Sequence, residues 1–190
     1  MDGCTLAVGW GRTLRQAVRE TRGKSLPNLK VLSLLGGLHY GSANNTAEIA
    51  SSFASLFGGS YYYLAAPVFA SSDEYRDMML AEGSVQDVLG QARNADMALV
   101  TVGDLLGHYL NKDGEEVDHP LNRRVISLDL EDLRHIRKVV LVSGGPYKAD
   151  IIRAVLLCKF VHELVIDEAT AEQLLGQPVT EKPRLEKRVS

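Results

Sequence analysis

Cysteine is scarce in this sequence, with only Cys4 and Cys158 among 190 residues. Neither belongs to a Cys-x-x-Cys pair or to a Cys/His cluster, so the sequence predicts no zinc site. Two isolated cysteines are typical of a reducing compartment, and we expect a cytoplasmic protein. Long apolar runs are also lacking: no stretch could cross a bilayer, and the first residues do not form a signal peptide. We therefore expect no membrane partner.

An excess of charge of one sign is lacking as well. The formal net charge is -3, and the basic residues are spread along the chain apart from its C-terminal tail. This distribution excludes the electrostatic footprint of a stand-alone nucleic-acid binder. The length and a hydrophobic content of 45% predict one domain with a substantial core over residues 1–176, followed by a polar tail over residues 177–190.

The sequence does contain a regular alternation of short apolar runs and helical patterns. This rhythm predicts an α/β fold with a Rossmann-like, largely parallel sheet covered by helices on both faces. The runs predicted to be strands are Thr5–Val8, Leu29–Leu35, Ser60–Ala65, Met97–Val102, Val139–Val142 and Leu164–Ile166. In such sheets ligands bind beyond the carboxyl ends of the strands, so the loops that follow the strands are the candidate sites.

One predicted strand carries three consecutive tyrosines, Tyr61, Tyr62 and Tyr63. Alternation along a strand sends the middle ring to the opposite face, which argues against a stacking platform for bases. We expect these rings to pack in the core. Any exposed part of this strand, and the helix that carries Met78 and Met79, are candidate surfaces for self-association.

Glycine-containing loops follow three of the predicted strands: Gly9–Thr13, Gly36–Gly37 and Gly144–Gly145. The first and third lead directly into helices, whose free N–H groups suit a phosphate. Arg12 and Lys148 add a cation beside these two helix starts, and Thr13 adds a hydroxyl donor. The sequence therefore predicts that Arg12, Thr13 and Lys148 surround one anion. The alternative is that each loop is only a tight turn and each cation only a solvated surface charge.

Nucleotide motifs and catalytic constellations are missing. Residues 8–13, VGWGRT, supply Gly-x-Gly without the third glycine of the dinucleotide fingerprint, and no P-loop is present. We therefore expect no cofactor. The five histidines are scattered without the spacing of metal ligands. Asp104 could bind hydroxyls or act as a base, although an Asp that follows a Gly is commonly only a turn residue.

Taken in order, seven motifs resemble the effector-binding domain of the SorC family of bacterial transcription regulators. They are VGWGRT (8–13), LLGGL (34–38), NNTAEIA (44–50), LAAP (64–67), GDLLGHYLNKDGEEV (103–117), SGGPYKADIIRAVL (143–156) and LVIDEATAEQLL (164–175). Each motif is only moderately specific, whereas their order and spacing over most of the chain are highly specific.

The resemblance implies a fold similar to that of ribose-phosphate isomerases and glucosamine-phosphate deaminases. It also implies a sensor of a phosphorylated sugar rather than an enzyme. A homo-oligomer, dimeric or tetrameric, would meet operator DNA through a helix-turn-helix domain that is absent from this chain. The ligand-binding residues carried over by the resemblance are Gly11, Arg12, Thr13, Gly36, Gly37, Asp104, Asn111 and Lys148.

This sequence departs from the family pattern in three places. It lacks the helix-turn-helix and the opening strand and helix of the sensor domain. It lacks a segment that relatives usually carry between Val102 and Gly103, and it has Asn111 where the family often has Asp. Two other functions stay open: a sugar-phosphate isomerase or deaminase, for which Asp104 has no evident acid/base partner, and a ligand-blind oligomerisation module.

Overall fold

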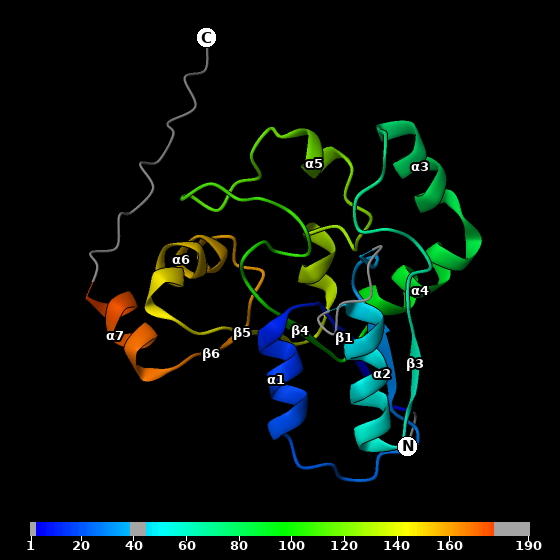
Figure 1. Cartoon of the computed structure of the whole chain (residues 1–190), viewed down its shortest axis with the longest axis horizontal. Helices are drawn as coiled ribbons and strands as arrows, with labels where there is room; N and C mark the ends of the chain where they lie inside the picture. Colours follow the sequence, from blue (N-terminus) through cyan, green and yellow to red (C-terminus); the bar gives the residue numbers. More distant parts are fainter. Residues whose placement is uncertain (1–2, 39–44, 177–190) are drawn as a thin grey trace.

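The computed structural model describes residues 3–38 and 45–176, so the predicted tail over residues 177–190 lies outside the described residues. Six parallel strands form one sheet in the order β3-β2-β1-β4-β5-β6 (Figure 1). The strands are β1 (Thr5–Val8), β2 (Lys30–Ser33), β3 (Ser60–Tyr62), β4 (Met97–Val100), β5 (Val139–Val142) and β6 (Glu163–Val165). The predicted α/β fold with a parallel sheet is confirmed.

Helices cover both faces of this sheet. They are α1 (Arg12–Glu20), α2 (Thr46–Phe57), α3 (Asp73–Ala81), α4 (Gly83–Arg93), α5 (Pro120–Arg123), α6 (Ala149–Leu157) and α7 (Glu168–Leu175), with 3-10 turns η1 (Glu131–His135) and η2 (Pro146–Lys148). The helices α1 and α2 pack side by side on one face, while α4, η1 and α6 pack on the other (Figure 1). None of the helices in the described part of the chain is both long and apolar enough to span a bilayer.

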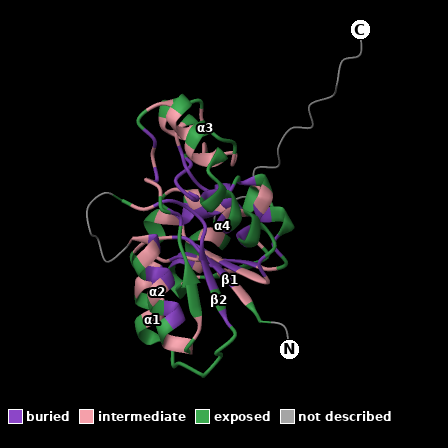
Figure 2. Ribbon diagram, turned by 90° about the vertical axis from the view of Figure 1, so that its right-hand side faces the viewer, coloured by how far each residue is buried: buried purple, intermediate pink, exposed green. Residues whose placement is uncertain are grey.

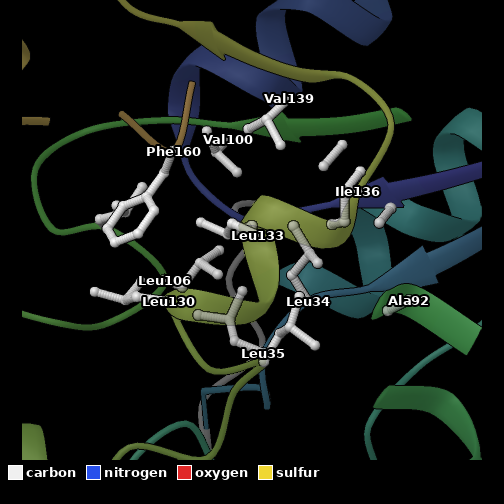
Figure 3. Close-up of a cluster of buried hydrophobic side chains, with 14 of the residues drawn as sticks. Leu34, Leu35, Ala92, Val100, Leu106, Leu130, Leu133, Ile136, Val139 and Phe160 are labelled. Atoms are coloured by element: carbon white, nitrogen blue, oxygen red, sulfur yellow. The ribbon is translucent and has the colours of Figure 1, made fainter. Parts of the chain in front are cut away.

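Two hydrophobic clusters hold these layers together because each central strand is apolar on both faces. In β1, Leu6 and Val8 join the cluster beneath α1 and α2, whereas Ala7 joins the cluster on the opposite face. Figure 3 shows the larger cluster, in which Leu133 and Ile136 of the η1 region lie against the strands β4 and β5. Burial is therefore concentrated along the central strands β2, β1, β4 and β5 and the inner sides of the helices (Figure 2).

The predicted core packing of the three tyrosines is wrong. Tyr61, Tyr62 and Tyr63 are 44%, 40% and 50% exposed, and the rings of Tyr61 and Tyr63 stack with their centroids 6.2 Å apart. The reason is topological: β3 is an edge strand and pairs only with β2. Its side chains therefore lack the cover that the central strands receive. The observed strand is also shorter than the predicted one, since it ends at Tyr62 rather than at Ala65.

A close backbone approach explains Gly36, which follows the second strand. Its amide donates a hydrogen bond to the carbonyl of Ile126, and a Cβ atom at this position would lie 2.5 Å from the carbonyl oxygen of Pro67. The neighbouring Gly37 forms a parallel bridge with Pro67. Only glycine fits between these segments, so Gly36 has a packing role independent of any ligand.

Replacing Gly36 with Ala is expected to lower the free energy of unfolding by about 1–3 kcal/mol, because the new methyl group must displace rigid backbone. Urea unfolding followed by circular dichroism measures the change. Gly90→Ala is the matched control, since a Cβ atom there meets nothing within 4 Å in the middle of α4. We expect this control to be neutral or stabilising by up to about 1 kcal/mol. Equal stability of the two variants would contradict the packing role.

Candidate functional site

The strand order reverses between β1 and β4, and this point is where parallel α/β sheets form their ligand crevice. Backbone and side-chain hydrogen bonds tie the two strand ends together. The amide of Gly9 donates to the carbonyl of Leu99 at 2.9 Å, and the hydroxyl of Thr101 donates to the carbonyl of Trp10 at 2.8 Å. The loops after β1 and β4 are therefore held side by side at the carboxyl edge of the sheet.

A side-chain hydrogen bond also joins these two loops. Nε1 of Trp10 donates to Oδ1 of Asp104 at 3.1 Å, and the amide of Gly107 donates to the same oxygen at 2.7 Å. The other carboxylate oxygen of Asp104 has no hydrogen-bond partner among residues 3–38 and 45–176. One oxygen of Asp104 therefore stabilises the local turn, and the second oxygen is available to accept a hydrogen bond.

The first glycine loop leads into α1, as the sequence predicts. Gly11 has a φ angle of 113°, which favours glycine, and it occupies the N-cap position without a side-chain capping bond. The N–H groups of the first helical turn are thus left without a capping side chain. Arg12 is exposed and Thr13 is half-buried in this same turn. This helix start can donate hydrogen bonds to an anion, with a cation beside it.

The glycine loop after β5 is organised differently. Oδ2 of Asp167 accepts hydrogen bonds from the amide of Gly145 at 2.8 Å and from the hydroxyl of Thr170 at 2.7 Å. A Cβ atom on Gly144 would lie 2.8 Å from the same oxygen. The Thr170 hydroxyl, followed by the Gly145 and Thr170 amides, lowers the pKa of Asp167 to about 2. The Gly145 amide is therefore already engaged.

Lys148 supplies the cation after β5. The chain here begins as the 3-10 turn η2, and α6 starts only at Ala149. Lys148 is partly exposed, with its Nζ 5.9 Å from the centroid of the Tyr147 ring. Ser143 at the end of β5 is buried, and its hydroxyl has no partner among the described residues. Lys148 itself forms no ion pair within the described part of the chain.

Arg12 and Lys148 follow strands that are not neighbours, and they lie at the starts of helices on opposite faces of the sheet, since α1 packs on one face and α6 on the other. The strand β4 separates β1 from β5, which places the two strand ends about 10 Å apart at the usual spacing of about 4.8 Å. The two side chains make no contact with each other. A sugar phosphate could bridge this span, so their convergence on one ligand stays a prediction.

Gly37 lines a separate cavity of about 340 Å³ at the ends of β2 and β3. Other residues that line it include Ser33, Asn45, Thr46 and Tyr63. Asn45 exchanges two hydrogen bonds of 3.4 Å with the backbone of Leu38. Neither Arg12 nor Lys148 lines this cavity.

Asn111 has a defined role within its own turn. Its Oδ1 accepts hydrogen bonds from the amides of Asp113 at 2.9 Å and Glu115 at 3.0 Å, the pattern by which Asn closes a turn. The turn packs on α6, where the thiol of Cys158 donates to the carbonyl of Gly114 at 2.8 Å. The carbonyl oxygen of the Asn111 side chain is therefore occupied, and its predicted contact with a sugar is untested.

Sequence reasoning did not single out Trp10 or Asp167 as parts of the site. Trp10 lies inside the VGWGRT motif, but the hydrogen bond that makes it relevant joins positions 94 residues apart. Asp167 carried a recognisable signal: it caps α7 and accepts from the amide of Thr170, three residues on.

No cluster of three or more metal-ligating side chains occurs within residues 3–38 and 45–176.

This geometry defines an α/β ligand-binding domain, with glycine loops and cations gathered at the carboxyl edge of a parallel sheet. A comparison with known protein families also indicates a ligand-binding domain. The chain matches the family model described as "Putative sugar-binding domain" in two parts, residues 1–106 and 101–176. The chain belongs to this family.

The relatives of this chain are transcription regulators. It is 30% identical over 206 aligned positions to the erythritol catabolism regulatory protein EryD of Brucella abortus, covering 93% of this chain and 65% of the relative. It is 26% identical to the deoxyribonucleoside regulator of Bacillus subtilis, covering 92% and 65%. The chain thus spans about two thirds of the length of these relatives.

The fold is also that of a known regulator. The full-length sorbitol operon regulator SorC of Klebsiella pneumoniae superposes with a TM-score of 0.85 at 17% identity, over 91% of this chain and 67% of that one. The resemblance to the SorC-type effector domain is confirmed by these matches. The family is one of regulator domains, and nothing in it supports the isomerase or deaminase alternative.

The pKa of Asp167 predicts a pH dependence. The folded-state value of about 2 lies below the unfolded value of about 3.9, so the ionised carboxylate stabilises the fold above about pH 4. This contribution falls as the pH drops from about 4 towards 2. An NMR titration of the Asp167 carboxyl carbon should show a midpoint near pH 2.

Thr170→Val is the matched control, because it keeps the shape of the buried side chain and removes the hydroxyl that contributes most to the shift. In this variant we expect the pKa of Asp167 to rise towards its ordinary value. A wild-type midpoint near pH 4 would contradict the hydrogen-bonded arrangement of Asp167, Gly145 and Thr170.

Proposed function

We propose that this chain is the effector-binding domain of a cytoplasmic transcription regulator of carbohydrate metabolism, and that its effector is a phosphorylated sugar. The observation that carries the proposal is the start of α1, which lacks a capping side chain, follows Gly11 at the carboxyl edge of the sheet and has Arg12 beside it. Free N–H groups of a helix start bind phosphate oxygens, and a nearby cation adds charge complementarity.

The names of the relatives support a carbohydrate effector. One regulates erythritol catabolism, another is a deoxyribonucleoside regulator. The sugar moiety would lie across the ends of β1, β4 and β5, with Asp104 available to its hydroxyls and Lys148 to its charge. Operator DNA would be bound through a helix-turn-helix domain of the whole regulator, which fits the net charge of -3 of this chain.

A thermal-shift screen against ribose, deoxyribose, fructose and glucosamine phosphates tests this function, because a ligand of the native state raises the melting temperature. Lys148→Ala should weaken the binding of the stabilising compound roughly 10- to 100-fold, since a hydrogen bond to a charged group is lost. Lys24→Ala is the matched control: it removes the same charge from an exposed position between α1 and β2.

Two outcomes would count against the proposed function. One is the absence of stabilisation by every phosphorylated sugar in the screen. The other is turnover: if NMR shows that the chain converts a sugar phosphate, and Asp104→Ala abolishes this conversion, the enzyme alternative is restored. Equal binding by the Lys148 and Lys24 variants would instead remove Lys148 from the site.

We also propose that the domain self-associates as a dimer or tetramer, with β3 as the contact. This strand leaves one edge unpaired within the described sheet. No charged residue occurs from Gly58 to Ser72, whereas exposed edge strands are usually protected by charges. Two copies can pair antiparallel across a two-fold axis, which would bring Tyr61 and Tyr63 of one copy opposite those of the other.

Tyr62→Lys is expected to shift the protein towards the monomer in multi-angle light scattering, because a charge on the edge opposes strand pairing. Met78→Lys is the control: Met78 is 60% exposed on α3, the second candidate surface in the sequence. If Met78→Lys dissociates the oligomer and Tyr62→Lys does not, the contact lies on α3. A wild-type chain that is monomeric at all concentrations would contradict self-association.

A further inference from the structure

The helix α1 and its connection to β2 concentrate positive charge on one part of the surface. Residues 12–24 contain five arginines and lysines and a single acidic residue, Glu20, although the whole chain has a net charge of -3. We propose that this segment binds the phosphate backbone of duplex DNA. The side chains that would do so, which we call the α1 basic surface, are Arg15, Arg19, Arg22 and Lys24. The inference rests on the proposed function, because it takes the chain to be part of a regulator that works on DNA.

The spacing of the helix places these cations together. Arg15 and Arg19 are four residues apart in α1, so their side chains lie on the same side of the helix. Leu14 is fully buried and Val18 packs against the hydrophobic cluster beneath α1, so the apolar side of the helix faces the sheet. Arg15 is half-buried, while Arg19 and both cations of the connection to β2 are exposed. Figure 1 shows α1 and this connection at the periphery of the molecule, where a large partner can reach them.

None of these four cations forms an ion pair within the described part of the chain. The one carboxylate of the segment, Glu20, accepts a hydrogen bond from the side-chain amide of Gln16 at 2.7 Å. Cations on other surfaces do form ion pairs with carboxylates: Arg76, Arg93, Arg123, Arg124, Arg134 and Lys138. The α1 basic surface therefore differs from the rest of the surface in its uncompensated charge.

This charge opposes the stability of α1. Like charges four residues apart on a helix repel each other, as Arg15 and Arg19 do. Neither arginine has an acidic residue three or four positions away that could offset the repulsion. Sequence choices that act against the local structure are expected mainly at functional sites. A polyanion bound along the helix would remove the repulsion.

Duplex DNA fits this surface by its charge and its shape. It carries one negative charge per about 1.7 Å of its axis, and proteins bind it by neutralising phosphates with lysine and arginine. At a rise of about 1.5 Å per residue, Arg15 and Arg19 are displaced by about 6 Å along α1, so a row of cations meets a row of phosphates. Such contacts position a protein on DNA without reading its sequence. A weak contact suffices, because another domain of the regulator would hold this surface close to the DNA.

The experiment measures the binding of the whole chain to a fluorescent duplex of arbitrary sequence by anisotropy, at several salt concentrations. The affinity should fall as salt rises, with a log–log slope of about -3 or steeper, since each neutralised phosphate contributes about -0.9. The double variant Arg15→Gln with Arg19→Gln should bind roughly tenfold more weakly at low salt, and its slope should be shallower by about 2.

Arg137→Gln with Lys159→Gln is the matched control, because both side chains are exposed and the pair removes the same charge outside the α1 basic surface. This control should bind the duplex as the wild type does. The melting temperature of the Arg15 and Arg19 double variant should equal or exceed that of the wild type, since a repulsive pair is removed from the helix. Its loss of binding then does not come from unfolding.

Polyglutamate serves as a second probe, because an acidic protein surface is the rival partner. If the chain binds polyglutamate more tightly than the duplex, and the Arg15 and Arg19 double variant loses that binding, the DNA inference is overturned. It is also overturned if the chain does not bind the duplex at low salt, or if the two double variants lose affinity equally.

The sugar-phosphate screen distinguishes this inference from the proposed function. Stabilisation by a phosphorylated sugar without duplex binding would overturn the α1 basic surface alone. Duplex binding that depends on Arg15 and Arg19, without stabilisation by any phosphorylated sugar, would support this surface and count against the proposed effector.

Discussion

All six strands run in the same direction, and the rest of the structure depends on this constraint. Parallel strands need long crossovers, so helices must return the chain over one face or the other. Crossovers from β1 to β2 and from β2 to β3 use α1 and α2, while later ones use the opposite face. The direction of the crossovers reverses between β1 and β4, the place at which parallel α/β sheets bind ligands. The position of the candidate site is thus a consequence of the sheet order.

The two glycine loops that lead into helices have different physical roles. The loop before α1 leaves its helical N–H groups without a capping side chain, which suits an anion. The loop after β5 is already held by a carboxylate, because Asp167 binds the Gly145 amide and caps α7. Lys148 is therefore the group after β5 that is available to an anion, and its flexible side chain suits a point contact with phosphate. A binding domain needs such groups and no acid/base pair, in keeping with relatives that are named as regulators.

Several residues that the family resemblance assigns to ligand binding also stabilise the fold of this chain. Gly36 is required by the backbone of Pro67, and Asn111 closes its own turn with two amide hydrogen bonds. One oxygen of Asp104 stabilises a turn, and the other has no hydrogen-bond partner within the described residues. A shared motif therefore identifies the place of a residue in the fold more directly than its contact with an effector.

The sequence by itself determined the alternation of strands and helices, the parallel sheet and the glycine loops at the strand ends. These features are local, since they follow from apolar runs, helical periodicity and turn residues that lie close together in the chain. Only the tertiary structure decided that β3 is an edge strand with exposed tyrosines, and that Trp10 in the loop after β1 meets Asp104 in the loop after β4. Both depend on which strands are neighbours, and that order is set by the packing of the whole sheet rather than by any one segment.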